Sequence, residues 1–185
     1  MKTIGEFVME ELCLIRPTHQ YAKQIKQFKT AMLEAGNTLD GTAFLKNFDH
    51  VDEWIDFVLM QDKKENNPAG MVPVTQYLCI RTSDDVLVGM IDIRHELNDY
   101  LASYGGHIGY SIHPNERNKG YAKRQLQLAL KKVTELGLEK VLVTCADTNI
   151  ASKKVIEASG GVYEDTQFDP TDNTHTLRYW ITISK

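Results

Sequence analysis

The sequence lacks the features that mark secreted, membrane-spanning and nucleic-acid-binding proteins. Its three cysteines, Cys13, Cys79 and Cys145, lie far apart in apolar stretches and form no CxxC pair. We expect them to be buried thiols in a reducing compartment, with no disulfides and no cysteine-bound metal. No apolar run approaches the roughly 18–20 residues that span a bilayer. With 21 basic and 25 acidic residues the net charge is −4, so we expect neither a membrane nor a nucleic acid as partner.

A secretory leader is not expected either. The stretch 1–15 is interrupted by Glu6, Glu10 and Glu11, so it holds no continuous apolar segment. A hydrophobic fraction of 42% and a charged fraction of 25% are typical of globular proteins. The length suits one domain over 1–185. These features together predict a cytoplasmic protein of a single domain.

Hydrophobic periodicity predicts a mixed α/β domain. The predicted strands cover 12–15, 74–81, 86–94, 106–113, 140–145, a short stretch around Val162, and 174–183. The predicted helices cover 18–35, 42–61, 120–136 and 149–159. The short turn Ser83-Asp84-Asp85 favours an antiparallel hairpin between the second and third strands. The strand–helix–strand segment from Gly106 to Cys145 favours a right-handed parallel crossover.

One loop carries the clearest chemical signal. A strand ends, a short loop follows, and a helix begins at Gly120 with Arg117, Lys119 and Lys123 nearby. The first amides of a helix lack internal partners and the helix dipole is positive there, so such a start attracts anions. Gly120 and the small Ala122 let a bulky group approach the backbone closely. The loop matches neither GxxxxGK[ST] nor GxGxxG, and the alternative interpretation is a solvated cationic turn.

The loop also carries a resemblance to a known family. Arg117-x-x-Gly120-x-Ala122, between a strand and a helix, resembles the [RQ]xxGx[GA] acetyl-CoA signature of the GNAT superfamily of N-acyltransferases. Asn149 follows the next predicted strand, where GNAT proteins commonly place an asparagine that contacts the cofactor. The resemblance covers about 12–183. Within the superfamily, the chain is similar to a group of bacterial predicted acetyltransferases. The resemblance implies a GNAT-like fold, with a mixed, mostly antiparallel central sheet, flanking helices and a parallel strand–helix–strand crossover.

The resemblance implies a binding site for acetyl-CoA. The amides of 119–123 would cradle the pyrophosphate, and the strand end would pair its backbone with the pantetheine arm. The thioester would lie where two strands of the signature region splay apart. The implied cofactor-binding residues are Ile112, His113, Arg117, Asn118, Lys119, Gly120, Tyr121, Ala122, Lys123, Asn149 and Ser152.

By the same resemblance the protein is an acyltransferase, an N-acetyltransferase whose acceptor is the amine of a small molecule or a peptide. Direct attack by the amine on the acetyl thioester requires a base, donors for the developing oxyanion and an acid for the thiolate. His107, Glu96 and His95 are the candidate bases. His107 lies near the usual position of a base, the other two follow the preceding strand, and histidine titrates near neutrality. We expect no metal site among the histidines.

The acid is the point at which this sequence departs from the family pattern. Many GNAT enzymes place a tyrosine seven residues after the asparagine, and here that position is Ile156. Tyr163, Tyr121 and water are the alternative proton donors. The departure also leaves a second interpretation open, a non-catalytic acyl-CoA-binding or sensing module. Dimers are frequent in the family, so a homodimer is included among the expected partners.

Overall fold

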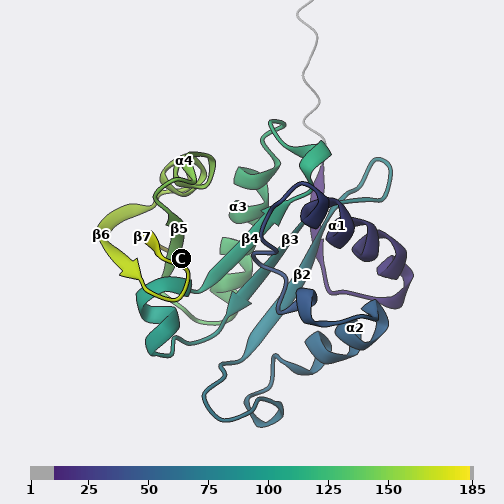
Figure 1. Cartoon of the computed structure of the whole chain (residues 1–185), viewed down its shortest axis with the longest axis horizontal. Helices are drawn as coiled ribbons and strands as arrows, with labels where there is room; N and C mark the ends of the chain where they lie inside the picture. The colour runs from purple at the N-terminus through teal and green to yellow at the C-terminus, as the bar shows by residue number, and fades with distance from the viewer. Residues whose placement is uncertain (1–10, 184–185) are drawn as a thin grey trace, which may run out of the picture.

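The structure is a computed structural model that describes residues 11–183. Seven strands form one sheet in the order β1-β2-β3-β4-β5-β7-β6 (Figure 1). The strands are β1 Leu12–Ile15, β2 Val74–Arg81, β3 Val86–Arg94, β4 Ile108–Ile112, β5 Lys140–Ala146, β6 Val162–Asp169 and β7 Thr174–Thr182. The helices are α1 Ala22–Glu34, α2 Val51–Met60, α3 Tyr121–Glu135 and α4 Ile150–Ala158. Single helical turns lie at His19–Tyr21, Leu45–Asn47, Lys64–Asn66, Leu101–Gly105 and Pro114–Glu116.

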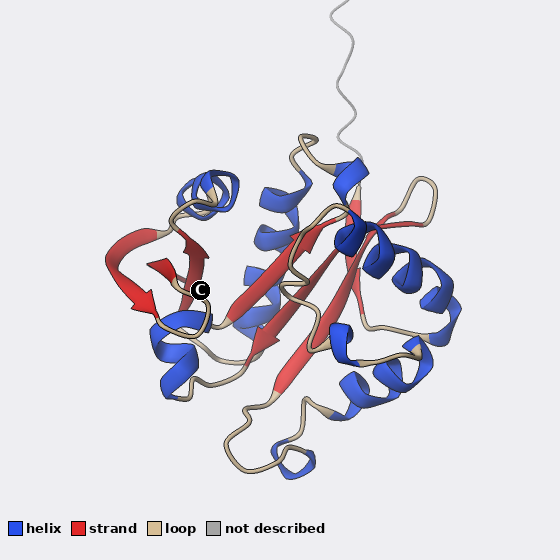
Figure 2. Ribbon diagram, in the orientation of Figure 1, coloured by secondary structure: helices blue, strands red, loops and turns tan. Residues whose placement is uncertain are grey.

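Helices cover both faces of the central strands, because successive side chains of a strand point to opposite faces. Met90 of β3 packs in a core with α1 and α2, and its neighbour Ile91 packs in a core with α3. Figure 2 shows the helices on the two sides of the sheet. Each fully buried side chain of this size stabilises the fold by roughly 1.5–3 kcal/mol. The two cores together fix β3 and β4 between the helical layers.

The sheet is antiparallel except where β4 pairs with β5, and this confirms the mixed, mostly antiparallel sheet with one parallel crossover. The parallel ladder contains one register pair, Ile108 with Val143. His107 strengthens the junction just before this pair. Its backbone N–H donates to the Leu142 carbonyl at 2.7 Å, and its Nδ1 accepts the Leu142 N–H at 2.9 Å. Beyond Ile108 the two strands diverge.

The predicted helix over 42–61 is wrong in its first half. The helix begins only at Val51, and Ala43 and Phe44 have positive φ angles of 41° and 64°. The Trp54 indole donates to the carbonyls of Thr42 and Ala43 at 2.9 and 3.1 Å. Tertiary packing therefore overrides the helical pattern here, because those carbonyls bond to a side chain instead of the amides four residues on.

The loop before α2 lies across β4. Gly41 sits so close to Gly109 that an added Cβ would lie 2.2 Å from the Gly109 carbonyl oxygen. The Ser111 hydroxyl donates to the Asp40 carbonyl at 2.8 Å, and the Gln76 amide donates to the Gly41 carbonyl at 2.9 Å. These contacts hold the loop over the central strands, as Figure 1 shows beside the β4 label.

The remaining elements follow the predictions, with ends that move by a few residues. The helix predicted over 18–35 begins with a tighter turn at His19–Tyr21, and the strand predicted over 106–113 is shorter, because β4 covers Ile108–Ile112. Cys79 and Cys145 are buried free thiols, and Cys13 is partly buried. Glu6 and Glu10, which argued against a leader, lie outside the described residues. Within 11–183 no helix is long and apolar enough to cross a membrane.

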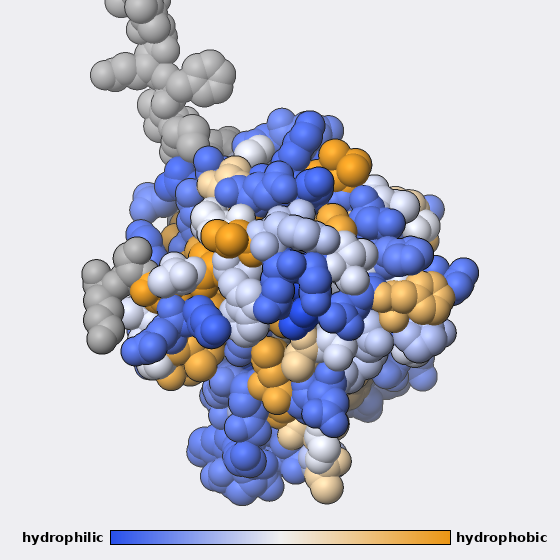
Figure 3. All heavy atoms as spheres, turned by 90° about the vertical axis from the view of Figure 1, so that its left-hand side faces the viewer, coloured by the Kyte–Doolittle hydropathy of each residue, from blue (hydrophilic) through white to orange (hydrophobic). Residues whose placement is uncertain are grey.

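The C-terminal side of the sheet ends at β6, which is an edge strand. Val162, Tyr163 and Phe168 are exposed on it, with Val162 70% exposed. Figure 3 looks onto the left-hand side of Figure 1 and shows apolar surface broken into separate patches among hydrophilic ones. This face therefore presents no single broad apolar surface.

The close approach of the loop to β4 predicts that Gly41→Ala destabilises the protein. The left-handed backbone costs an alanine about 1–2 kcal/mol, and overpacking against Gly109 adds about 1–3 kcal/mol. Gly70→Ala is the matched control, since Gly70 has a positive φ of 88° and open space around it. Urea unfolding measures both variants. Equal losses in the free energy of unfolding would contradict the packing of this loop on β4.

The buried His107 predicts acid sensitivity. Burial, together with the positive charge of Arg94, lowers the pKa of His107 from 6.5 to about 4. As the pH falls, His107 therefore becomes protonated near pH 6.5 in the unfolded chain but only near pH 4 in the folded protein. The stabilisation is complete above pH 6.5 and is lost as the pH falls from 6.5 to about 4. At pH 5 the loss is about 2 kcal/mol.

A His107→Asn variant tests this dependence, because the Asn carbonyl can accept the Leu142 N–H and does not titrate. Urea unfolding at pH 7 and pH 5 should show a smaller loss of stability in the variant than in the wild-type protein. The same loss in both proteins would place the acid-sensitive group elsewhere.

Candidate active site

A cleft of about 410 Å³ opens at the end of β4, between the start of α3 and the start of α4. The residues predicted from the sequence to bind the cofactor line this cleft, with the exception of His113 and Lys119. The lining includes Ile112, Arg117, Asn118, Gly120, Tyr121, Ala122, Lys123, Asn149 and Ser152. Residues of two separate motifs thus share one cavity, and their role in binding stays a prediction.

The first turn of α3 forms one wall. Gly120 caps this helix in the left-handed region, with φ 79°, and an added Cβ would meet no atom within 4 Å. A side chain at this position would therefore meet open space where Gly120 lines the cleft. Gly120 precedes a helix of 15 residues, and the first backbone amides of a helix have no intrahelical carbonyl to bond to. This wall has the character of an anion-binding site.

The charged side chains of the loop divide into two groups. The Lys119 ammonium is 2.8 Å from Glu116, and Glu116 also pairs with Arg81 at 2.7 Å. Burial alone would raise the pKa of Glu116, but the two cations outweigh it and hold that pKa below its ordinary value. Lys119 is therefore neutralised within the loop, outside the cleft lining. Arg117 and Lys123 are the cationic residues among those that line the cleft.

Arg117 also ties the loop to the rest of the site. Its Nε donates to the Ile112 carbonyl at 3.2 Å, and its guanidinium donates to the Asn37 side-chain oxygen at 3.2 Å. The end of β4 and the loop after α1 are thereby linked through one side chain. His113 turns the other way, since its ring packs edge-on against Phe28 and its Nδ1 accepts the Asn115 N–H.

The opposite wall brings β4 and α4 together through hydroxyl groups. Tyr110 Oη lies 2.8 Å from Ser152 Oγ, and both residues line the cleft. The side-chain oxygen of Asn149 accepts the Ser152 N–H at 3.1 Å and so caps α4. Burial raises the pKa of Tyr110 to about 12. Nothing in the sequence signalled Tyr110, because its partner lies 42 residues further along the chain.

The three candidate bases lie away from this cleft. His107 is 6% exposed, and its Nδ1 lone pair is used by the Leu142 N–H. His95 Nε2 bonds to the Thr75 hydroxyl at 2.8 Å on the β2 side, and Glu96 pairs with Lys64 at 3.0 Å. Ile112 follows His107 by five positions, about 17 Å at roughly 3.4 Å per residue. The structure does not bring these three side chains to the residues of the loop.

The loop over β4 covers or carries two acidic residues that the sequence analysis missed. Asp40 lines it, and its carboxylate accepts the Thr38 hydroxyl at 2.6 Å. Asp92 is buried under the same loop, paired with Arg94 at 3.1 Å. An acidic residue within the otherwise apolar 86–93 was a signal for Asp92. Asp40 gave no such signal, because only the fold brings its loop over β4.

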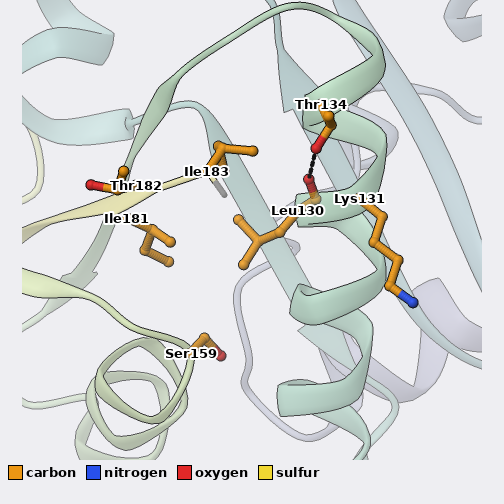
Figure 4. A pocket seen from close by; sticks show the side chains of 7 residues that line it. All are labelled: Leu130, Lys131, Thr134, Ser159, Ile181, Thr182 and Ile183. Atoms are coloured by element: carbon orange, nitrogen blue, oxygen red, sulfur yellow. Dashed lines mark hydrogen bonds between the residues drawn. The ribbon is translucent and has the colours of Figure 1, made fainter. Parts of the chain in front are cut away.

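A second hollow, of about 260 Å³, lies between the C-terminal half of α3 and the end of β7 (Figure 4). The Thr134 hydroxyl is bonded to the Leu130 carbonyl at 3.3 Å, and Lys131 points away from Ile181 and Ile183. No acidic, histidine or cysteine side chain is among the described residues that line it. The cleft between α3 and α4 is therefore the better candidate for chemistry.

Comparison with solved structures gives the fold. The acetyltransferase (GNAT family) from Bacillus anthracis superposes with a TM-score of 0.64 at 20% identity, over 96% of this chain and 98% of that one. The microcin C7 self-immunity acetyltransferase MccE, in complex with acetyl-CoA and AMP, gives a TM-score of 0.67 at 14% identity, over 94% and 93% of the two chains. At these identities the likeness shows the fold.

Sequence comparison gives the family. The Bacillus subtilis (strain 168) protein described as uncharacterized N-acetyltransferase YnaD is 30% identical over 100 residues, 54% of this chain and 54% of that protein. The match thus spans about half the length of this curated relative. The family described as "Acetyltransferase (GNAT) domain" matches residues 13–162, which include β4, the loop and α3. The chain therefore belongs to the GNAT family of acetyltransferases.

Proposed function

We propose that this protein is an acetyl-CoA-dependent N-acetyltransferase, a single domain over 1–185 that transfers an acetyl group to the amine of a small molecule or peptide by direct attack. One observation carries the proposal: the N-terminus of α3, the end of β4 and the start of α4 line one cleft. The free thiols of Cys13, Cys79 and Cys145 support a reducing, cytoplasmic setting.

The chain's own groups fit the cofactor. The amides after Gly120, with Lys123 and Arg117, would hold the pyrophosphate, and the Ile112 backbone and the Asn149 side chain would hold the pantetheine arm. Each charge-assisted hydrogen bond contributes roughly 1.5–3 kcal/mol, and micromolar affinity needs about 8 kcal/mol. A few such bonds therefore suffice. When bound, acetyl-CoA supplies the activated acetyl group as a thioester.

We propose Asp40 as the group that binds or deprotonates the incoming amine, ahead of His107, Glu96 and His95. Asp40 lines the cleft, whereas the other three are bonded to Leu142, Lys64 and Thr75 outside it. Its carboxylate is exposed and held by the Thr38 hydroxyl. The negative charge would also favour a cationic amine at this end of the cleft.

Gly120→Glu is expected to abolish the binding of CoA. The new carboxylate would project into the cleft and repel the pyrophosphate at the helix start. Gly137→Glu is the matched control, because Gly137 follows the other end of the same helix, has φ 73° and has open space around it. Both variants carry the same charge change and the same backbone strain, so the comparison isolates the position.

Isothermal titration calorimetry with acetyl-CoA measures the affinity of both variants. We expect micromolar binding in the wild-type protein and in Gly137→Glu, and at least a hundredfold weaker binding in Gly120→Glu. Equal binding by the two variants would refute the placement of the pyrophosphate.

Turnover is the second test. The protein is assayed with a panel of primary amines and of peptides with free amino termini, and free CoA is measured with a thiol reagent. We expect some of these acceptors to increase CoA release above the hydrolysis background. With the best acceptor, Asp40→Asn should lower kcat/KM for the amine by about 100-fold, while the affinity for acetyl-CoA changes little. His95→Gln, Glu96→Gln and His107→Asn are assayed beside it. If any of these three variants lowers kcat/KM more than Asp40→Asn does, the base is that residue, near the start of β4, and not Asp40.

The alternative function, a non-catalytic acyl-CoA-binding module, has one observation in its favour. Ile156, at the position where many relatives carry a tyrosine, is fully buried in the core beneath α4. That interpretation predicts tight binding of acetyl-CoA without amine-dependent CoA release. The two assays above separate it from the enzyme.

A further inference from the structure

Tyr110 and Ser152 place two hydroxyl groups in the cleft, one on β4 and one on α4. We propose that Tyr110 is the residue that protonates the departing sulfur of CoA, and that Ser152 is its positioning residue. The inference rests on the proposed function and assigns the acid that the family's usual position lacks in this chain.

The position of Tyr110 follows from the divergence of the strands. Ile108 still pairs with Val143 on β5, whereas Tyr110, two residues later on the same face of β4, bonds to α4 instead. Its ring packs against the core that contains Leu126 and Ile156. The core therefore holds the ring in place, and Tyr110 lines the cleft.

The other candidate donors are less well placed. Tyr163 is 54% exposed on the edge strand β6, and its hydroxyl bonds to Thr166. The Tyr121 hydroxyl accepts a hydrogen bond from Arg81 at 3.2 Å. Tyr179 is buried, with its hydroxyl near Glu157 at 3.4 Å. Tyr110, by contrast, bonds across the cleft to Ser152 on α4.

The hydrogen bond to Ser152 suits a donor role. When the Ser152 hydroxyl donates to Tyr110 Oη, the phenolic proton is left to point into the cleft. Burial raises the pKa of Tyr110 and the bond from Ser152 opposes it, with a net value of about 12. Tyr110 therefore keeps its proton at neutral pH, and the bond from Ser152 makes it a better acid than burial alone would.

The proposed step is balanced in atoms and charge. The amine nitrogen forms a bond to the thioester carbon, and the carbon–sulfur bond breaks with its electron pair on sulfur. Tyr110 gives its proton to that sulfur, and the proton lost by the amine returns through solvent to the phenolate. The products are the acetylated amine and CoA with a free thiol.

The test measures the pKa of the CoA thiol while it is bound. A hydrogen bond from Tyr110 stabilises the thiolate and lowers that pKa. Ultraviolet absorbance of the thiolate is followed from pH 6 to 10 in the complex with CoA, and the same titration with desulfo-CoA is subtracted to remove the protein's own tyrosines. We expect the bound thiol pKa to lie about one to two units lower in the wild-type protein than in Tyr110→Phe.

Two further variants sharpen the comparison. Ser152→Ala should give a bound thiol pKa between those of the wild-type protein and Tyr110→Phe, and Tyr163→Phe, the matched control, should leave it at the wild-type value. With the best acceptor, Tyr110→Phe should also lower kcat about 100-fold with little change in KM for acetyl-CoA. Variants that bind CoA with the same thiol pKa as the wild-type protein would overturn the role of Tyr110.

The possible failures are distinguishable. A wild-type protein that does not bind CoA refutes the proposed function itself. Binding of CoA with a thiol pKa that is indifferent to Tyr110→Phe refutes only the proton donor. A Tyr110→Phe variant with lower melting temperature and weaker CoA binding, but an unchanged thiol pKa, would assign Tyr110 a structural role.

Discussion

The candidate site depends on how β4 separates from β5. The parallel ladder between these strands holds one register pair, and His107 closes its end with a backbone bond and a side-chain bond to Leu142. Because parallel strands need a crossover, α3 must begin at the open end of the gap. The unpaired edge, the helix N-terminus and the cap of α4 therefore meet at one place. The position of the cleft is therefore a consequence of the strand topology, and the side chains determine its shape and charge.

The other side of the cleft depends on close backbone packing. Gly41 lies against Gly109: a Cβ at Gly41 would overlap the Gly109 backbone, and a Cβ at Gly109 would lie 3.0 Å from the Gly41 nitrogen. Two glycines in contact bring the loop after α1 close to β4, and Trp54 holds the loop through its indole N–H. The positive φ angles of Ala43 and Phe44 are local strain that these contacts maintain. The same packing that shapes the loop thus places Asp40 beside Ser111.

The sequence predicted those parts of the structure that are encoded locally. The stripe of α3, its start at Gly120 and the cap at Asn149 depend on neighbours within a few residues, so pattern and spacing were sufficient to find them. The extended helix over 42–61 was wrong because Trp54 bonds to carbonyls of its own loop. Tyr110 escaped notice because its contact with Ser152, which the sequence did single out, depends on the divergence of two strands. Most of the fold was therefore predictable, but only half of the cleft.

Charge in the site is local and does not follow the net charge of the chain. The chain carries −4, yet the loop that opens α3 is rich in cations. Glu116 neutralises part of that charge by pairing with Arg81 and Lys119, and this fixes the loop's shape. Arg117 and Lys123 remain at the cleft. Since charges are screened within about 8 Å at physiological salt, these two and the helix amides set the field at the start of α3, while Asp40 adds a negative charge elsewhere in the cleft lining. An acidic protein can in this way offer an anion-binding site without becoming a general binder of polyanions.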